Sequence, residues 1–231
     1  INPGFPNPFA NGVLSQTITA NVSRLADNLS SPYIFVAQNG FNYKLDKSIT
    51  FEGIYTFKRG LHHFRSRNIN APINGIRPNP TFGNIQFLES SGTSQEHSFD
   101  LKVNGYYRGI NIFGNYELGK DINDFFSALS LPMDNNNLRL ERGVSSLNQT
   151  HKLNVTFNFD LFKKINVSPS FRLESGFPYT ITTGRDDNGD TVFNDRPNGF
   201  GRNTERGEFL KQVDVRFRWK LPMKYLGFKG T

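Results

Sequence analysis

Residues 150–173 read THKLNVTFNFDLFKKINVSPSFRL, and apolar side chains alternate with polar ones along most of this stretch. Lys163 and Lys164 interrupt the alternation near its middle. In a β-strand, successive side chains point to opposite faces of the sheet, so a period of two gives one apolar face and one polar face. The stretch therefore predicts a hairpin of two long antiparallel strands joined by a tight turn at the two lysines.

Similar alternation recurs and predicts about seven strands that are long enough to cross a membrane as β-strands. They are expected near 33–45, 48–61, 97–107, 109–119, 150–162, 165–174 and 208–221.

The connections between these strands fall into two classes that alternate along the chain. Tight turns are expected at 46–47, 107–109 and 163–164, and long polar connections at about 62–96, 120–149 and 175–207. Outer-membrane barrels have short periplasmic turns and longer extracellular loops, whereas a soluble β-sandwich has no reason to sort its connections in this way. The fold class predicted is therefore all-β: a segment of an antiparallel, up-and-down transmembrane β-barrel with long extracellular loops.

The remaining segments are assigned around this frame. Residues 1–32 are expected to be an extracellular loop or lead-in, residues 33–221 part of the barrel, and residues 222–231 a turn or truncated end of a longer chain. A short strand is expected near 14–20. Two smaller elements are expected within the long connections: a hairpin above the membrane at 82–88 and a short helix at 122–131.

Composition agrees with a barrel and narrows the classes of partner. Aromatic residues make up 14% of the chain, although its mean hydropathy is only −0.51. The sequence has no cysteine, which excludes disulfides, thiolate metal sites and a cysteine nucleophile. The net charge is +7, but the basic residues are mostly spread singly. This spread favours a polar lumen or the phosphates of lipopolysaccharide over nucleic acid as their surroundings.

An acidic stretch in the last long connection is the sharpest candidate for a ligand site. Asp186, Asn188 and Asp190 lie two residues apart, and Asp195 follows. Ca²⁺ prefers several oxygen ligands, and turns rich in Asp and Asn supply them at such spacing. The alternative is a turn in which these side chains accept hydrogen bonds from their own backbone.

Three charged residues are expected to order the long connections. Glu141 and Arg142 are candidates to brace residues 120–149, and Arg196 is a candidate for an ion pair with Asp195. The sequence contains no Gly-x-Ser-x-Gly elbow, and its paired carboxylates lie in a loop rich in Gly and Asn. We therefore do not expect an enzyme.

Two passages resemble a known family. The first is Leu138-Arg-Leu-Glu-Arg-Gly-Val-Ser-Ser146, and the second runs from Ser175-Gly-Phe-Pro-Tyr-Thr-Ile181 through Asn194-Asp-Arg-Pro197 to Gly201-Arg-Asn203. Together they are similar to the C-terminal part of the barrel in Oar-like TonB-dependent receptors, the family with a carboxypeptidase-regulatory-like domain. The resemblance implies a bacterial outer-membrane barrel of about 22 strands with a plugged lumen.

The resemblance also implies energised uptake of an extracellular substrate, with the TonB system engaged through an N-terminal part outside this sequence. Two other hypotheses stay open. One is a structural or adhesive outer-membrane barrel without transport, or a scaffold subunit of a larger assembly. The other is a soluble β-sandwich, which would require a second sheet over the apolar face of residues 150–173.

Overall fold

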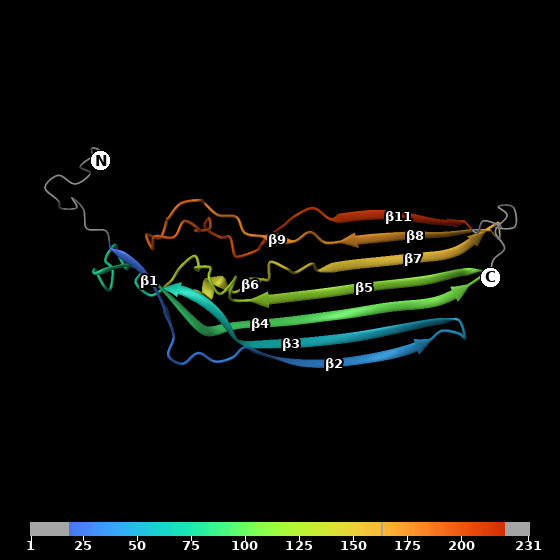
Figure 1. Ribbon diagram of the computed structural model, residues 1–231, viewed down its shortest axis with the longest axis horizontal. Coiled ribbons are helices and arrows are strands. Elements are labelled where there is room, and N and C mark those ends of the chain that lie inside the picture. Colours follow the sequence, from blue (N-terminus) through green and yellow to red (C-terminus); the bar gives the residue numbers. More distant parts are fainter. Residues whose placement is uncertain (1–18, 163, 220–231) are drawn as a thin grey trace, which may run out of the picture.

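The computed structural model describes residues 19–162 and 164–219 as an essentially all-β structure (Figure 1). One large sheet has the strand order β11-β8-β7-β5-β4-β3-β2, and all neighbours in this order are antiparallel. Its long strands are β2 (Tyr33–Lys44), β3 (Ile49–Asn68), β4 (Phe82–Tyr107), β5 (Ile110–Asn123), β7 (His151–Leu161), β8 (Ile165–Glu174) and β11 (Leu210–Trp219).

Several short elements accompany the long strands. These are β1 (Ala20–Leu25), η2 (Leu138–Glu141, a 3-10 helix), β6 (Gly143–Val144), β9 (Pro178–Tyr179) and β10 (Glu205–Arg206). None of the helices among the described residues has the length and apolar character needed to span a membrane. Lys163, most of the strand expected near 14–20 and the end segment expected at 222–231 lie outside the described residues.

The connections are sorted by length between the two ends of the sheet. Residues 45–48, 108–109 and 162–164 join neighbouring strands at one end, whereas 69–81, 124–150 and 175–209 lie at the other (Figure 1). The shortest connection has positive φ at both residues, 49° at Arg108 and 89° at Gly109. This is the geometry of a type I′ turn, whose twist matches that of a two-stranded hairpin. The alternation of short and long connections is therefore present in the structure.

The β3–β4 hairpin is longer than the sequence predicts. Residues 82–88, expected in a hairpin above the membrane, form the first part of β4, which continues without a break to Tyr107. Their partners are residues of β3 beyond the expected strand end, such as Ser66 opposite Leu88. An irregularity in register between Gly60 and His63 separates this extension from the rest of the hairpin. Strand β1 pairs in parallel with this extension of β4. Because β3 ends at Asn68 and β4 begins at Phe82, the loop between them comprises only residues 69–81.

The short helix expected at 122–131 is also wrong. Residues 122 and 123 complete β5, and residues 124–131 form irregular backbone. Asp124 fixes this end of the strand, because its carboxylate accepts hydrogen bonds from the backbone N–H and the hydroxyl of Thr93 at 2.6 and 2.8 Å. The side chain that ends β5 therefore ties the following loop to β4 and prevents a helical start.

The sheet has one apolar face and one polar face, and the strand register keeps them separate. One row across the sheet reads Phe41, Gly53, Leu101, Tyr116, Leu153 and Leu173. The adjacent row on the other face reads Asn42, Glu52, Lys102, Asn115, Asn154 and Arg172. Among the described residues no second sheet covers the apolar face, and Phe171, Leu173 and Phe217 stay exposed. The soluble-sandwich hypothesis is therefore wrong.

The best-buried residues lie at the loop end of the sheet, and most of them are polar. The largest fully buried side chains are Asn68, Asn70 and Asn135, whereas only Ala26, Ala71, Ile85 and Val167 form the buried hydrophobic set. Such buried amides are stable only when their donors and acceptors are satisfied within the protein. The loops therefore form an ordered body held by hydrogen bonds, and this body is the region where a site can be built.

Candidate functional site

The three long connections, residues 69–81, 124–150 and 175–209, form one loop body at the end of the sheet. A chain of buried residues joins the end of β3 to the second and third connections. The backbone N–H of Asn68 donates to Oδ1 of Asn135 at 2.5 Å, and Nδ2 of Asn135 donates to Oδ2 of Asp190 at 2.6 Å. These three residues are only 1–2% exposed. The second connection thus bridges the end of β3 to the third connection through a single amide side chain.

The first connection is folded around Asn70. Its Nδ2 donates to the carbonyl oxygens of Asn79, Phe82 and Gly83 at 2.9, 3.1 and 2.7 Å. Arg77 closes the same turn by donating to the Asn70 carbonyl at 2.9 Å. A buried asparagine that satisfies three backbone carbonyls replaces the ladder bonds that the loop lacks.

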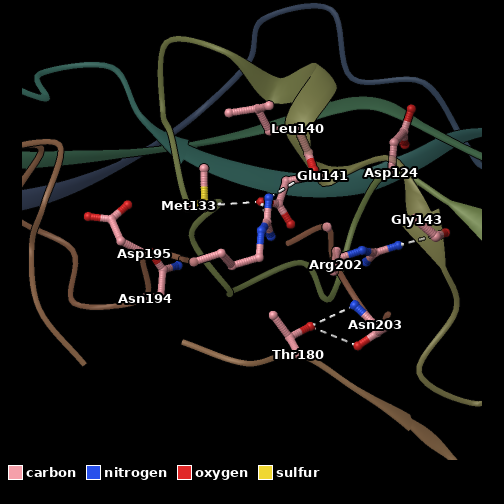
Figure 2. Close-up of polar contacts among 12 residues, drawn as sticks. Asp124, Met133, Leu140, Glu141, Gly143, Thr180, Asn194, Asp195, Arg202 and Asn203 are labelled. Atoms are coloured by element: carbon pink, nitrogen blue, oxygen red, sulfur yellow. Dashed lines mark hydrogen bonds and ion pairs between the residues drawn. The ribbon is translucent and has the colours of Figure 1, made fainter. Parts of the chain in front are cut away.

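A buried ion pair joins the second and third connections. Nη1 of Arg196 lies 3.1 Å from Oε1 of Glu141, and the two side chains are 5% and 10% exposed. The same Glu141 oxygen accepts the backbone N–H of Met133 at 3.1 Å, and Nη2 of Arg196 donates to the carbonyl of Leu140 at 2.9 Å (Figure 2). Arg142 follows η2 and is exposed. The expected partners were therefore misassigned: Arg196 pairs with Glu141 across loops and not with Asp195.

A second buried arginine was not found by sequence reasoning. Arg202 is 5% exposed and donates to the carbonyls of Phe125 and Asn123 at 2.7 Å each, to that of Gly143 at 3.3 Å, and to the Asn123 side chain (Figure 2). Burial lowers its pKa from the ordinary value, which nearby carboxylates such as Glu141 oppose. The guanidinium thus binds the end of β5 to the third connection.

Asn203, beside Arg202, fixes the backbone of the same segment. Its Nδ2 donates to the carbonyl of Val144 at 2.7 Å, and it exchanges two hydrogen bonds of 2.9 Å with the hydroxyl of Thr180 (Figure 2). Its φ is +56°, in the left-handed region that asparagine tolerates better than most residues. Asparagine and arginine are also common in solvated loops. Arg202 and Asn203 differ from such residues only in their contacts with residues far away in the sequence, which a local pattern does not reveal.

The acidic stretch predicted as a calcium site forms a compact turn. Asp186 accepts the backbone N–H groups of Asp190 and Thr191 on its two oxygens, at 2.9 Å each. Oδ1 of Asn188 accepts the same N–H of Asp190, also at 2.9 Å. These are the bonds of an Asx-type turn, in which side chains take the place of backbone carbonyls.

The two remaining carboxylates of the stretch are buried and are also engaged. Asp195 is 3% exposed and accepts the backbone N–H groups of Asp187 and Asn188, at 2.5 and 3.1 Å, and Nδ2 of Asn188 at 2.9 Å. Asp190 accepts from Asn135 and from a backbone amide two residues ahead. Burial raises the pKa of Asp190, and these hydrogen bonds oppose the shift. Sequence reasoning therefore selected four residues that do meet in space, and each of their carboxylate oxygens accepts an N–H.

No group of three or more His, Cys, Asp or Glu side chains within residues 19–162 and 164–219 is arranged to hold a metal ion. The acidic stretch forms turns and contacts between loops. Its carboxylates chiefly accept hydrogen bonds from backbone N–H groups. Calcium binding there stays a prediction.

Beneath the loop body, the polar face of the sheet carries paired charges. Lys58 bonds Glu96 at 3.0 Å, and Lys152 bonds Glu117 at 3.0 Å. A recess of about 200 Å³ lies between these strands and the second connection, lined by Glu96, Glu117, Asp121, Asn148, Gln149 and Lys152, among others. The site thus consists of a polar wall that leads up to an ordered body of loops.

Comparison with known proteins agrees with this architecture. Two solved structures share the fold: the outer membrane transporter YddB from Escherichia coli, with a TM-score of 0.60 and 14% identity over 88% of this chain, and the FrpB iron transporter from Neisseria meningitidis (F3-3 variant), with a TM-score of 0.52 and 13% identity over 86%. The chain spans only 28% and 26% of those two proteins.

Sequence comparison identifies the family directly. No sequence among the curated proteins matches the chain. Residues 1–216, however, match the family described as "Outer membrane beta barrel domain". The open antiparallel sheet, its apolar outer face and its sorted connections are those expected of a barrel wall in the bacterial outer membrane. The chain belongs to the outer membrane β-barrel domain family.

Proposed function

We propose that this chain forms part of the wall of a TonB-dependent receptor of the Oar-like type, which takes up a substrate from outside the cell. The observation that carries the proposal is the polar face. In the regular part of the strand registers, below the irregularity between Gly60 and His63, every Asp and Glu lies on this face: Glu52, Glu96, Asp100, Glu117, Asp121, Asp160, Glu174 and Asp214. A face of this kind suits a hydrated lumen that contacts a plug and a passing polar substrate.

The two edges of the sheet fit a wide barrel. Strands β2 and β11 stand at the two edges, and every residue along both is exposed. Further strands must cover such edges, because open strand edges are not tolerated in lipid. Barrels that enclose a plug have about 22 strands, far more than this sheet supplies. The fold shared with two outer membrane transporters supports the same size class.

A structural or adhesive barrel, or a scaffold subunit, is the second candidate. The loop body favours it, since buried contacts such as Glu141 with Arg196 give the outer surface a fixed shape that a protein partner could recognise. In that case the polar face would line the barrel without conducting a substrate. The two candidates differ in whether the parent protein couples to energy from the inner membrane.

The test uses the full-length parent protein in its own host. We expect the purified protein to bind the periplasmic domain of TonB in calorimetry. We also expect cells that lack the parent gene and cells that lack TonB to leave the same compounds unconsumed in the growth medium. An adhesive or scaffold barrel would bind no TonB, and its loss would leave consumption unchanged while altering attachment or assembly of the envelope.

A further inference from the structure

The apolar outer face of the sheet carries a small group of cations confined to its loop end. In the regular part of the long-strand registers, below the irregularity between Gly60 and His63, the outward-facing basic residues are Arg59, Lys120 and Lys211. Lys120 and Lys211 lie within three residues of the loop ends of β5 and β11, and Arg59 lies directly below the irregularity from which β3 and β4 extend further; no Asp or Glu shares their face in this part of the sheet. Because the long loops are extracellular in this family of barrels, this end lies in the outer leaflet.

Arg59 and Lys120 flank the same stretch of β4. Arg59 stands opposite Gln95, and Lys120 stands opposite His97. The two cations therefore lie on the two strands that flank β4, on the same face and two residues apart in register, and His97 stands directly beside Lys120. Two long cationic side chains at this spacing can converge on one anion, and Arg in particular matches the oxygens of a phosphate.

The histidine between them is held in place. Nδ1 of His97 lies 2.6 Å from the hydroxyl of Tyr55, and Nε2 lies 2.8 Å from the amide nitrogen of Gln95. The second tyrosine of this level, Tyr116, makes a similar contact of 2.8 Å with His151. Tyrosines with apolar rings and polar tips mark the membrane interface of outer-membrane barrels. The cations thus stand at the level of lipid headgroups.

A groove on the same face is lined by Lys120 and His97. It has a volume of about 360 Å³ and is lined by Tyr55, His97, Phe99, Leu118 and Lys120, among others. Its rings and aliphatic side chains continue downward into the apolar band that contacts the acyl chains. A ligand that combines phosphate with several acyl chains would therefore meet cations at the top of the groove and carbon surface below.

Three cations on the opposite face are already paired. Lys58, Lys102 and Lys152 face the lumen and lie 3.0, 3.7 and 3.0 Å from carboxylates of Glu96, Glu52 and Glu117. Within residues 19–162 and 164–219, neither Arg59 nor Lys120 has a carboxylate partner of this kind. Lys44, Arg216 and Arg218 also face the lumen and have no such partner among the described residues, whereas Arg59 and Lys120 combine the absence of a partner with a place on the apolar face, where an anionic lipid can reach them.

We propose that Arg59, His97 and Lys120 form a binding site for a phosphate group of lipopolysaccharide, with the lipid A acyl chains lying in the groove below. The site is independent of the proposed transport function, because it faces the lipid and not the lumen. It would anchor the barrel wall at a fixed depth and rotation in the outer leaflet. Loss of the site would leave TonB binding intact, so failure of this proposal and failure of the transport proposal are distinguishable.

The experiment measures lipid binding by the full-length parent protein in detergent, by thermal shift and by native mass spectrometry of lipid that co-purifies. The variant Arg59→Ala/Lys120→Ala is compared with Lys58→Ala/Lys152→Ala, which removes two cations from the lumen face of β3 and β7. Three probes are used: intact lipopolysaccharide, the same lipopolysaccharide with its phosphates removed, and inorganic phosphate.

We expect the outward variant to bind intact lipopolysaccharide roughly tenfold or more weakly, the magnitude of losing charge-assisted hydrogen bonds, and the lumen variant to bind like the wild type. Dephosphorylated lipid should bind the wild type as weakly as intact lipid binds the outward variant. Equal binding by both variants, equal binding of dephosphorylated lipid, or equally tight binding of inorganic phosphate alone would overturn the proposal. Arg59→Gln/Lys120→Gln, which keeps side-chain length, covers the case in which the alanine variant fails to fold.

Discussion

Arg196 and Glu141 form an ion pair between two extracellular loops, with Nη1 and Oε1 3.1 Å apart and both side chains almost fully buried. The residues are 55 positions apart in the sequence, and each also binds backbone on the other side of the contact or beside it. Among the described residues, this pair combines charge with burial more completely than the ion pairs on the strands. It therefore marks the point at which the second and third connections are most strongly joined.

Replacing Glu141 by alanine should open the loop body. The change leaves the Arg196 guanidinium and the Met133 N–H buried without their acceptor. Loss of one partner of a buried ion pair costs about 3–5 kcal/mol of stability, so the contact between the two loops should weaken strongly. We expect hydrogen exchange in residues 131–142 and 194–197 of the full-length protein to become faster together, while exchange in the strands stays unchanged.

Arg142→Ala is the matched control, because this neighbouring charge is exposed. It should leave exchange in both loops as in the wild type. If the two variants showed the same hydrogen-exchange rates in these loops, the ion pair would not be the contact that holds the loops together.

Asn135→Ala should uncouple the second connection from both the end of β3 and the third connection. The amide accepts the N–H of Asn68 and donates to Asp190, and leaving those buried groups unpaired costs about 1–3 kcal/mol each. We expect faster exchange at the end of β3 and in residues 186–195, although Asn135 belongs to neither. Asn136→Ala removes an exposed amide beside it and should change neither segment. Faster exchange confined to residues 133–137 would show that the bridge is only local.

The strands could be predicted from the sequence because their signal is local. In residues 153–161 and 165–173, each apolar side chain faces outward and each polar one faces the lumen, so the period of two is visible without knowing any contact. The turn residues carry a similar local signal. The position of β4 was harder, since the polar run from Glu89 to Glu96 hides a strand that is held by pairing with β3 outside the apolar band.

The loop body could be predicted only in part. Asp186, Asn188, Asp190 and Asp195 were recognised as a group because they are close in sequence. Arg202 and Asn135 act on residues at least 55 positions away, and nothing nearby distinguishes them from solvated loop residues. Burial in this region is decided by which loops meet, and that follows from the order of strands in the sheet.

Arg202→Lys should loosen the end of β5. The guanidinium binds carbonyls from Asn123, Phe125 and Gly143, a set that a single ammonium cannot satisfy in the same place. We expect limited chymotrypsin digestion of the full-length protein to cut after Phe125 or Phe126 several times faster than in the wild type. Arg185→Lys is the control, because this arginine is in the same connection but is 79% exposed at its side chain. Equal rates for both variants would contradict the bridging role of Arg202.

The calcium prediction is tested by titrating Ca²⁺ into the full-length protein in a calorimeter. In the structure, the carboxylates of Asp186, Asp190 and Asp195 already accept N–H donors from the chain, so a cation would have to displace them. We therefore expect the same heats for the wild type and for Asp190→Ala. Asp190→Asn keeps the shape of the side chain and serves as the control for loss of loop structure. Heat of binding that the wild type releases and both variants lack would instead establish a calcium site, with the turn rearranging around the ion.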